Sequence, residues 1–178
     1  MIRRLHKQDD SLSFENINKL QNILMGRNFP WFYRPVVDYE DDEDKFQFCH
    51  DFYFNQQPQS SSMNELLPIL DELRPLALVR IKANLLTRTP EIIENVFHYD
   101  ISDYDDGNRN LIYPKKLKQL TTAIFYVNTN NGYTKFEDGS IIESVANRMV
   151  IFPTNMKHTG TSCSDEKTRV VINFNYFK

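Results

Sequence analysis

Two ionisable side chains near the middle of the chain, His98 and Asp100, stand two positions apart in an apolar and aromatic run. In an extended strand, residues two apart point to the same face, so the imidazole and the carboxylate would lie side by side. The neighbours Val96, Phe97 and Ile101 are apolar, and a carboxylate in such surroundings is costly unless something compensates its charge. A divalent metal ion is the simplest compensation.

A third candidate ligand, His158, lies far downstream in the loop that follows Pro153. Two histidines and one carboxylate on one face of a metal form the facial triad of non-haem Fe(II) oxygenases, which leaves positions open for substrate and O₂. The pattern His-x-Asp is weak by itself because it occurs by chance in many proteins. The alternative is that His98 is a hydrogen-bonded strand histidine and that Asp100 begins a turn over residues 101–107.

The last candidate strand supplies a cation that fits the same chemistry. Its residues alternate, so that Arg169, Val171, Asn173 and Asn175 share one face. Such a face is either exposed to solvent or lines a polar pocket. Because arginine can bind a carboxylate with two parallel hydrogen bonds, Arg169 near the metal would hold the distal carboxylate of a dicarboxylic co-substrate. The other end of that co-substrate would chelate the ion.

Two helices and at least six strands must position these residues. The spacing of apolar residues predicts a helix over 13–24 with Ser13 as N-cap. A capping box at Ser62 predicts a second helix over 62–73, but Pro68 fits badly inside a helix and favours a start nearer to the proline. The predicted strands cover residues 78–87, 96–101, 120–128, 141–145, 149–152 and 169–177. This order predicts a mainly β protein, an antiparallel sandwich or barrel with N-terminal helices packed on one outer face.

Length and composition exclude several other classes. The 178 residues suit one domain, and 21 Lys and Arg against 24 Asp and Glu give a net charge of −3, which argues against nucleic-acid binding. Five glycines and two cysteines exclude a phosphate loop and a cysteine-rich zinc fold. No leader and no membrane-length apolar run is visible, so we expect two reduced thiols and a cytoplasmic protein.

Three other features have simple structural interpretations. His50 alternates with four phenylalanines over residues 46–54, which favours a hydrogen-bonded structural histidine, and His6 lies in a polar tail. The acidic segments 38–44 and 103–108 read as solvated loops. If they border an active-site entrance, they would favour a basic or polar substrate.

Taken in order, the C-terminal motifs resemble those of the Fe(II)- and 2-oxoglutarate-dependent dioxygenases, in the prolyl-hydroxylase-like branch. The resemblance covers residues 78–177, and segments 29–54 and 80–85 are more loosely similar to small phage and bacterial members. It rests on six motifs: His98-x-Asp100, Leu120-Thr-Thr-Ala-Ile-Phe-Tyr-Val-Asn128, Asn131-Gly-Tyr-Thr-Lys-Phe136, Asn147-Arg-Met-Val-Ile-Phe-Pro153, His158-Thr-Gly160 and Arg169.

The resemblance implies a fold, a reaction and a set of residue roles. The fold is a single dioxygenase domain over 1–178, with a double-stranded β-helix (jelly-roll) core over 78–178 and residues 1–77 as its support. The reaction uses Fe(II), 2-oxoglutarate and O₂ to hydroxylate a C–H bond, releasing succinate and CO₂, in the cytoplasm of a bacterium or of a phage-infected cell. His98, Asp100 and His158 would bind Fe(II).

The co-substrate pocket is implied in the same way. Arg169 would form a salt bridge to 2-oxoglutarate, and Tyr126 would add a hydroxyl to the same carboxylate. The other implied pocket residues are Thr122, Asn173 and Asn84, and apolar residues that would keep water away are Ile124, Val150 and Phe152.

Two departures from the family pattern bear on the substrate. Asn95 stands where prolyl hydroxylases often have a tyrosine, and Asn131-Gly132 replaces a Gly-Gly turn. Two alternatives stay open: a non-catalytic jelly-roll module, and a cupin-type metalloenzyme without co-substrate. Cupins usually carry His-x-His followed by a glutamate, and here Asp100 takes the second position. Nothing identifies the prime substrate; a peptide or protein side chain is favoured over a small molecule.

Overall fold

A computed structural model describes residues 4–37, 45–101 and 118–178 of the chain. The acidic segments 38–44 and 103–108 lie outside these residues, so the predictions made for them stay predictions. The described elements are β1 His6–Gln8, α1 Phe14–Leu24, β2 Phe32–Arg34, β3 Gln47–Phe54, β4 Gln57–Pro58, the 3₁₀ helix η1 Ser61–Leu66, α2 Leu67–Leu73, β5 Ala77–Thr87, β6 Leu120–Tyr126, β7 Tyr133–Phe136, β8 Ile141–Glu143, β9 Arg148–Pro153, β10 His158–Gly160 and β11 Thr168–Phe177.

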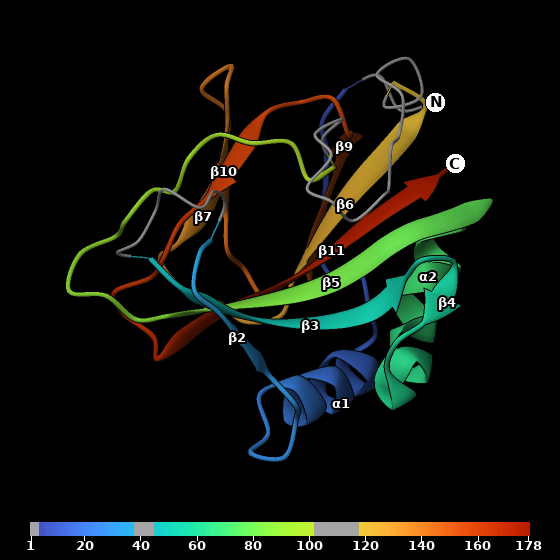
Figure 1. The fold of residues 1–178 in the computed structure, drawn as a ribbon, viewed down its shortest axis with the longest axis horizontal. Coiled ribbons are helices and arrows are strands. Elements are labelled where there is room, and N and C mark those ends of the chain that lie inside the picture. Colours follow the sequence, from blue (N-terminus) through green and yellow to red (C-terminus); the bar gives the residue numbers. More distant parts are fainter. Residues whose placement is uncertain (1–3, 38–44, 102–117) are drawn as a thin grey trace.

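The strands form two antiparallel sheets (Figure 1). The major sheet has eight strands in the order β1-β9-β6-β11-β5-β3-β2, and β4 pairs with β3. The minor sheet has three strands in the order β10-β7-β8. The last strand, β11, is central: it pairs with β5 on one side and β6 on the other, with Asn173 opposite both Lys82 and Ile124. The architecture is thus mainly β, as the sequence predicts.

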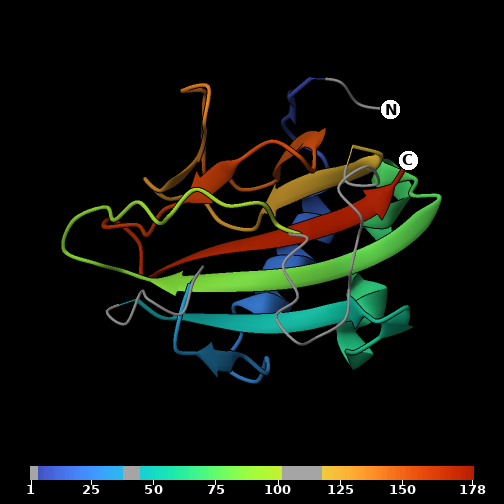
Figure 2. The ribbon, with the colours of Figure 1, turned by 45° about the horizontal axis from the view of Figure 1, so that its top comes forward.

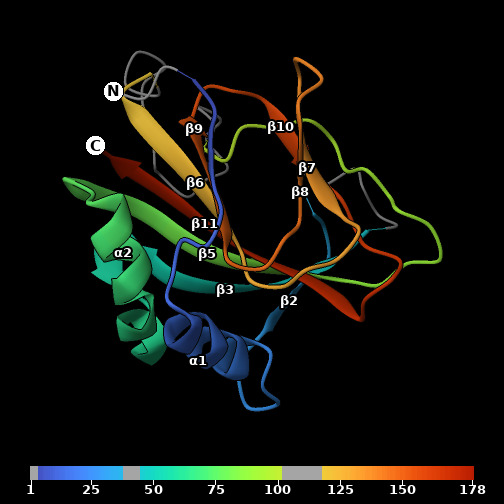
Figure 3. The ribbon, with the colours of Figure 1, turned by 180° about the vertical axis from the view of Figure 1, so that it is seen from behind.

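The helices cover one face of the major sheet (Figure 3). Helix α1 begins after Ser13, whose side chain accepts a hydrogen bond from the Asn16 backbone N–H at 3.3 Å, as the sequence predicts for its N-cap. Its buried residues pack with those of η1 and α2 against the apolar face of β3, β5, β6 and β11. This core leaves the opposite face of the sheet for polar side chains.

The minor sheet covers only part of that opposite face (Figure 2). Its Phe136 and Ile142 pack against apolar residues of β6, β9 and β11, namely Ile124, Tyr126, Val150, Phe152 and Val171. Within the described chain, this second core includes no residue of β5 or β3. The inner face of these two strands is therefore left for a cavity, described below.

The structure differs from the sequence predictions in several elements. His158, expected in a loop, begins strand β10, and strand β7 lies outside the predicted strand ranges. The predicted strand 96–101 forms no strand: it has one isolated bridge, at His98, and a second bridge at Glu94 precedes it, so it pairs with its neighbours at single residues only. The predicted second helix starts as the 3₁₀ helix η1 and becomes α-helical at Leu67, with Pro68 in its first turn, where a missing backbone N–H costs nothing.

Other predictions for buried side chains are confirmed. His50 is a structural histidine: its Nδ1 lies 2.8 Å from the Pro30 carbonyl and its Nε2 lies 2.7 Å from the Ser60 hydroxyl. Cys49 and Cys163 are free and buried. Over the described ranges, no helix is long and apolar enough to cross a membrane.

Candidate active site

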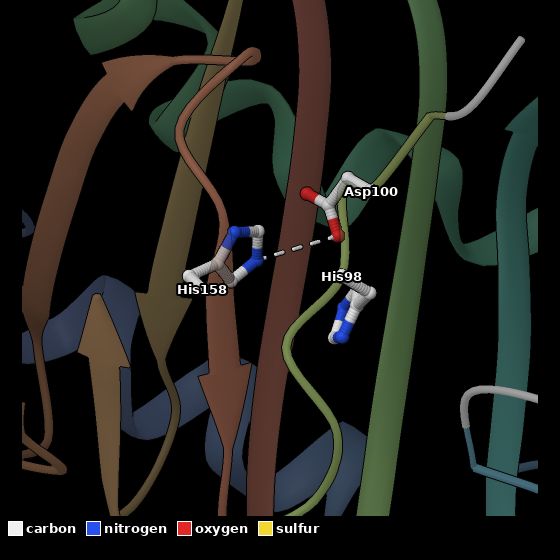
Figure 4. Close-up of side chains that lie close together, drawn as sticks. All are labelled: His98, Asp100 and His158. Atoms are coloured by element: carbon white, nitrogen blue, oxygen red, sulfur yellow. Dashed lines mark ion pairs between the residues drawn. The ribbon is translucent and has the colours of Figure 1, made fainter. Parts of the chain in front are cut away.

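His98, Asp100 and His158 lie together, as the spacing argument requires (Figure 4). The backbones of the two histidines form an isolated antiparallel bridge, with N–H to carbonyl distances of 2.9 and 3.1 Å in the two directions. One potential ligand atom from each of the three side chains lies within 4.8 Å of the others. The segment before Asp100 is therefore held to β10 by the residue pair that brings the two imidazoles side by side, and also by the Asn95 N–H, which donates to the Gly160 carbonyl oxygen at 3.1 Å.

Each histidine is oriented by a backbone carbonyl two residues earlier in the chain. His98 Nδ1 lies 3.0 Å from the Val96 carbonyl oxygen, and His158 Nδ1 lies 3.2 Å from the Met156 carbonyl oxygen. A carbonyl can only accept a hydrogen bond, so both Nδ1 atoms carry the proton. In each ring Nε2 is then the nitrogen with the lone pair that a metal requires.

Two asparagines hold the carboxylate of Asp100. The Asn173 amide donates to Oδ1 at 2.9 Å, and the Asn175 amide donates to Oδ2 at 3.1 Å. Arg80 supports this arrangement, because its Nε donates to Asn175 Oδ1 at 3.1 Å and its Nη2 lies 3.7 Å from Asp100 Oδ1. The Asp100 side chain is only 3% exposed, so its orientation is fixed on all sides.

The surroundings keep Asp100 ionised. Burial alone would raise the pKa of this carboxyl, but in the metal-free protein a protonated imidazole at His158, whose Nε2 lies 3.7 Å from Oδ1, and the charge of Arg80 outweigh it and hold the pKa well below its usual range. A buried carboxylate with two neighbouring imidazoles is a donor set suited to a divalent transition metal.

Arg169 is buried at 3% exposure in the same region. Its Nε donates to Ser144 Oγ at 2.8 Å and its Nη2 donates to Thr134 Oγ1 at 3.2 Å. Among residues 4–37, 45–101 and 118–178, no carboxylate forms an ion pair with it, and burial lowers the pKa of the guanidinium. A buried charge of this kind is costly unless a ligand supplies the counter-charge.

Tyr126 and Thr134 form a small hydroxyl network beside Arg169. The Tyr126 hydroxyl donates to Thr134 Oγ1 at 2.8 Å, and the guanidinium carbon of Arg169 lies 5.8 Å from the centre of the Tyr126 ring. Thr134 Oγ1 therefore accepts two hydrogen bonds, and its own proton is left to be donated elsewhere. Thr134, which lines the cavity, presents the hydroxyl there, and Tyr126 lies behind it.

These groups share one cavity of about 370 Å³. Its lining includes six of the eight residues that the sequence singles out, together with residues from the strands around them. The lining residues that matter here are His98, Asp100, His158, Arg169, Asn173, Asn84, Thr134, Gly160, Arg80, Lys82, Gln47 and Ile124. The cavity thus places the histidine and carboxylate cluster and the buried arginine in a common space.

Thr122 lies elsewhere than the sequence predicts. It is absent from the described cavity lining, and its hydroxyl accepts from the Asn175 amide at 3.1 Å and lies 2.9 Å from the Thr154 hydroxyl. Thr122 thus supports the asparagines that hold Asp100. Asn84 does line the cavity, and its Oδ1 lies 3.4 Å from Cys49 Sγ.

Sequence reasoning missed Thr134, Ser144 and Arg80. Arg80 stands in alternation with Lys82 and Asn84 on a strand, a pattern that could have placed all three on one face. Thr134 and Ser144 gave no such signal, because they reach Arg169 from the minor sheet and the turn after it. Only the pairing of the two sheets brings them there.

The backbone at Gly132 has no room for a side chain. A Cβ there would lie 2.6 Å from the Ser162 carbonyl oxygen and 2.7 Å from Arg169 Cδ. We expect Gly132→Ala to lower the free energy of unfolding by about 1–3 kcal/mol, as overpacked sites do, when measured by denaturant titration.

The control for this substitution is Gly139→Ala. Gly139 has a φ of +88°, so alanine is strained there too, but a Cβ would meet nothing within 4 Å. Only the Gly132 variant is expected to disturb Arg169. If both variants lose the same stability and keep the same Arg169 environment, the close approach at Gly132 has no consequence.

The fold of the described residues is similar to that of several solved structures. The described strands and helices have the fold of Fe(II)- and 2-oxoglutarate-dependent oxygenases, prolyl hydroxylases among them, which confirms at the level of fold the resemblance seen in the sequence. No protein-family model matches the chain, and no curated protein matches it in sequence.

Particular solved structures illustrate the similarity. A prolyl-4-hydroxylase from Pseudomonas putida has 16% identity and a TM-score of 0.56, covering 98% of this chain and 92% of its own. A prolyl hydroxylase from Trichoplax adhaerens, in complex with a peptide fragment of a hypoxia-inducible factor, has 9% identity and a TM-score of 0.65, covering 97% and 83%. The epimerase SnoN from nogalamycin biosynthesis, in complex with Fe³⁺, α-ketoglutarate and a nogalamycin compound, has 10% identity and a TM-score of 0.64, covering 98% and 78%.

Proposed function

We propose that this protein is an Fe(II)- and 2-oxoglutarate-dependent dioxygenase that hydroxylates a C–H bond. His98, Asp100 and His158 would hold the metal, and Arg169 would bind the distal carboxylate of 2-oxoglutarate. The whole chain would form one dioxygenase domain, with a double-stranded β-helix core over 78–178 supported by residues 1–77. The fold similarity supports this proposal, and the site residues of this chain supply its detail.

One observation carries the co-substrate assignment. Arg169 is a buried cation with no carboxylate partner in the described chain, and it lines the same cavity as the two histidines and Asp100. A dicarboxylate would satisfy the guanidinium at one end and reach the histidine cluster with the other. A purely structural arginine would instead be paired with an acid, as Arg148 is with Asp9.

The donor set fits Fe(II). Two imidazoles, each with Nδ1–H bonded to a carbonyl, and one ionised carboxylate are the ligand types of the facial triad. When bound, Fe(II) with 2-oxoglutarate supplies the O₂-dependent oxidation of a C–H bond. The protein residues position these groups and shape the cavity.

Four side chains prepare the co-substrate end of the cavity. Ser144 accepts from Nε and Thr134 accepts from one N–H of Nη2, which leaves the second Nη2 N–H and the two N–H groups of Nη1, near Gly160, as donors for a ligand carboxylate. A Cβ on residue 160 would lie 3.4 Å from Nη1, so glycine keeps this donor accessible. The Thr134 proton, freed by the Tyr126 hydrogen bond, can be donated to the same carboxylate.

Apolar residues around this end exclude water. Ile124 lines the cavity, and Val150 and Phe152 belong to the same buried cluster beneath the minor sheet. Phe136 and Phe152 also pack against the ring of His158, with centroids 5.9 and 4.9 Å away. A dry environment strengthens the electrostatic contacts of Asp100 and Arg169 and limits side reactions of the oxidant.

The decisive experiment combines ligand binding with turnover in the wild-type protein. Under anaerobic conditions, Fe(II) and 2-oxoglutarate together are expected to give a weak visible charge-transfer band that neither gives alone. Admission of O₂ is then expected to release succinate. A screen of peptides against small molecules, read as succinate above the substrate-free background, would test our preference for a peptide or protein side chain.

Each alternative function predicts a different negative result in the binding experiment. A non-catalytic module would bind no stoichiometric 2-oxoglutarate. A metalloenzyme without co-substrate would bind Fe(II) at the cluster but show no 2-oxoglutarate-dependent band. Either result would contradict the proposal.

A further inference from the structure

The cavity has two chemically different sides. Toward the minor sheet it is closed by the apolar cluster around Ile124 and by the Arg169 network. Toward β5 and β3, which contribute nothing to that cluster in the described structure, it is lined by Arg80, Lys82, Asn84 and Gln47. This second, polar side is the one that the co-substrate would leave vacant.

The cavity as a whole carries an excess of positive charge. The described lining holds three permanent cations, Arg80, Lys82 and Arg169, and one carboxylate, Asp100. In the proposed enzyme, a divalent metal and a dicarboxylate neutralise each other, so they do not remove this excess. Arg169 would pair with the co-substrate carboxylate. Arg80 already interacts with the Asp100 carboxylate and donates a hydrogen bond to Asn175. Asp51 is the register partner of Lys82 on β3 and the Lys82 ammonium donates a hydrogen bond to the Cys49 thiol, but among the described residues no carboxylate forms an ion pair with Lys82.

An unpaired acceptor lies beside these cations. Asn173, directly opposite Lys82 on β11, is 8% exposed, lines the cavity, and has no hydrogen-bond partner for its Oδ1. Its Nδ2 donates to Asp100, so a flipped amide would place oxygen against carboxylate oxygen. The acceptor is therefore fixed in place, and a buried acceptor of this kind needs a donor from a ligand or a water molecule.

We propose that Lys82, with Arg80 beside it, binds an acidic group, carboxylate or phosphate, of the prime substrate, and that Asn173 Oδ1 accepts a hydrogen bond from an N–H or O–H of the same molecule. The proposal rests on the proposed function, since it names the substrate class of that site. A half-buried lysine on a strand suits either oxyanion as a point charge. The oxidised C–H bond would then lie between this acidic group and the metal.

The test measures the binding of simple anions to a variant that lacks Arg169, because Arg169 would otherwise compete with Lys82 for the anion. Inorganic phosphate and acetate are titrated separately into metal-free Arg169→Leu protein by NMR or calorimetry. The same titrations are made on Arg169→Leu/Lys82→Gln and on Arg169→Leu/Lys167→Gln, in which an exposed lysine next to β11 loses the same charge. We expect loss of Lys82 to weaken anion binding about fivefold, the upper end for a partly exposed ion pair, and loss of Lys167 to have no effect. The tighter of the two anions distinguishes phosphate from carboxylate.

The outcomes separate this inference from the proposed function. Absence of anion binding in Arg169→Leu, or equal binding with and without Lys82, would overturn it. If Arg169→Leu does not fold, the titrations use wild-type and Lys82→Gln protein loaded with Mn(II) and 2-oxoglutarate, and equal anion affinity again contradicts it. Failure of the proposed function would appear differently, as wild-type protein that binds phosphate or acetate through Lys82 but does not bind 2-oxoglutarate.

Discussion

Replacement of Arg169 by leucine is expected to weaken 2-oxoglutarate binding at least about 30-fold, because truncating one partner of a buried charge pair costs about 2–5 kcal/mol. The metal-free variant should stay folded. Arg169 has no carboxylate partner in the described chain, so its removal leaves no buried charge unpaired. Calorimetry of the Mn(II)-loaded protein measures the affinity, and denaturant titration of the metal-free protein measures the free energy of unfolding.

Two further variants sharpen this prediction. Arg169→Lys keeps the charge but lacks the planar fork, so an intermediate loss of about tenfold is expected. Arg148→Leu is the matched control: Arg148 is also buried on a strand of the major sheet, but it is paired with Asp9 and does not line the cavity. This control should change 2-oxoglutarate affinity by no more than about twofold. Equal losses in Arg148→Leu and Arg169→Leu would contradict the assignment.

The sequence was most informative where the chemistry lies on regular strands. Alternation along the last strand put Arg169, Asn173 and Asn175 on one face, and in the structure Arg169 and Asn173 line the cavity while Asn175 bonds to Asp100. His98 and Asp100 also lie close together, although the segment that carries them forms no regular strand. A period of two is a local property that a sequence records directly.

Contacts between elements could not be read in this way. The predicted strand 96–101 has the residue types of a strand, yet only single bridges form, since pairing depends on what lies beside the segment. Tyr126 was expected to present its hydroxyl to the co-substrate, but the hydroxyl donates to Thr134, which comes from the other sheet. The position of Thr122 behind Asp100 likewise depends on the register of β6 against β11, which pairs Thr122 with Asn175.

Replacement of Asp100 by asparagine is expected to have an effect on metal binding as large as that of Arg169→Leu on the co-substrate. The variant loses the anionic ligand, and metal affinity should fall by more than the roughly 10–100-fold typical of changes in outer-shell partners. The substitution is also not isosteric in hydrogen bonding. Both carboxylate oxygens accept amide N–H groups, so an NH₂ group at residue 100 would face the donor of Asn173 or Asn175.

This donor conflict predicts a second, separate effect. A buried group left unsatisfied costs about 1–3 kcal/mol, so the free energy of unfolding of metal-free Asp100→Asn should fall by this amount.

Asn175→Leu removes the donor to Asp100 Oδ2 but keeps the charge of Asp100, and it should weaken metal binding by about 10–100-fold. Asp71→Asn, on the exposed side of α2, is the control and should change neither quantity. Mn(II) titration followed by electron paramagnetic resonance measures the affinity. If Asp100→Asn binds the metal with wild-type affinity, the metal binds elsewhere. Asn173 and Asn175 would then only stabilise a buried carboxylate that is not a metal ligand.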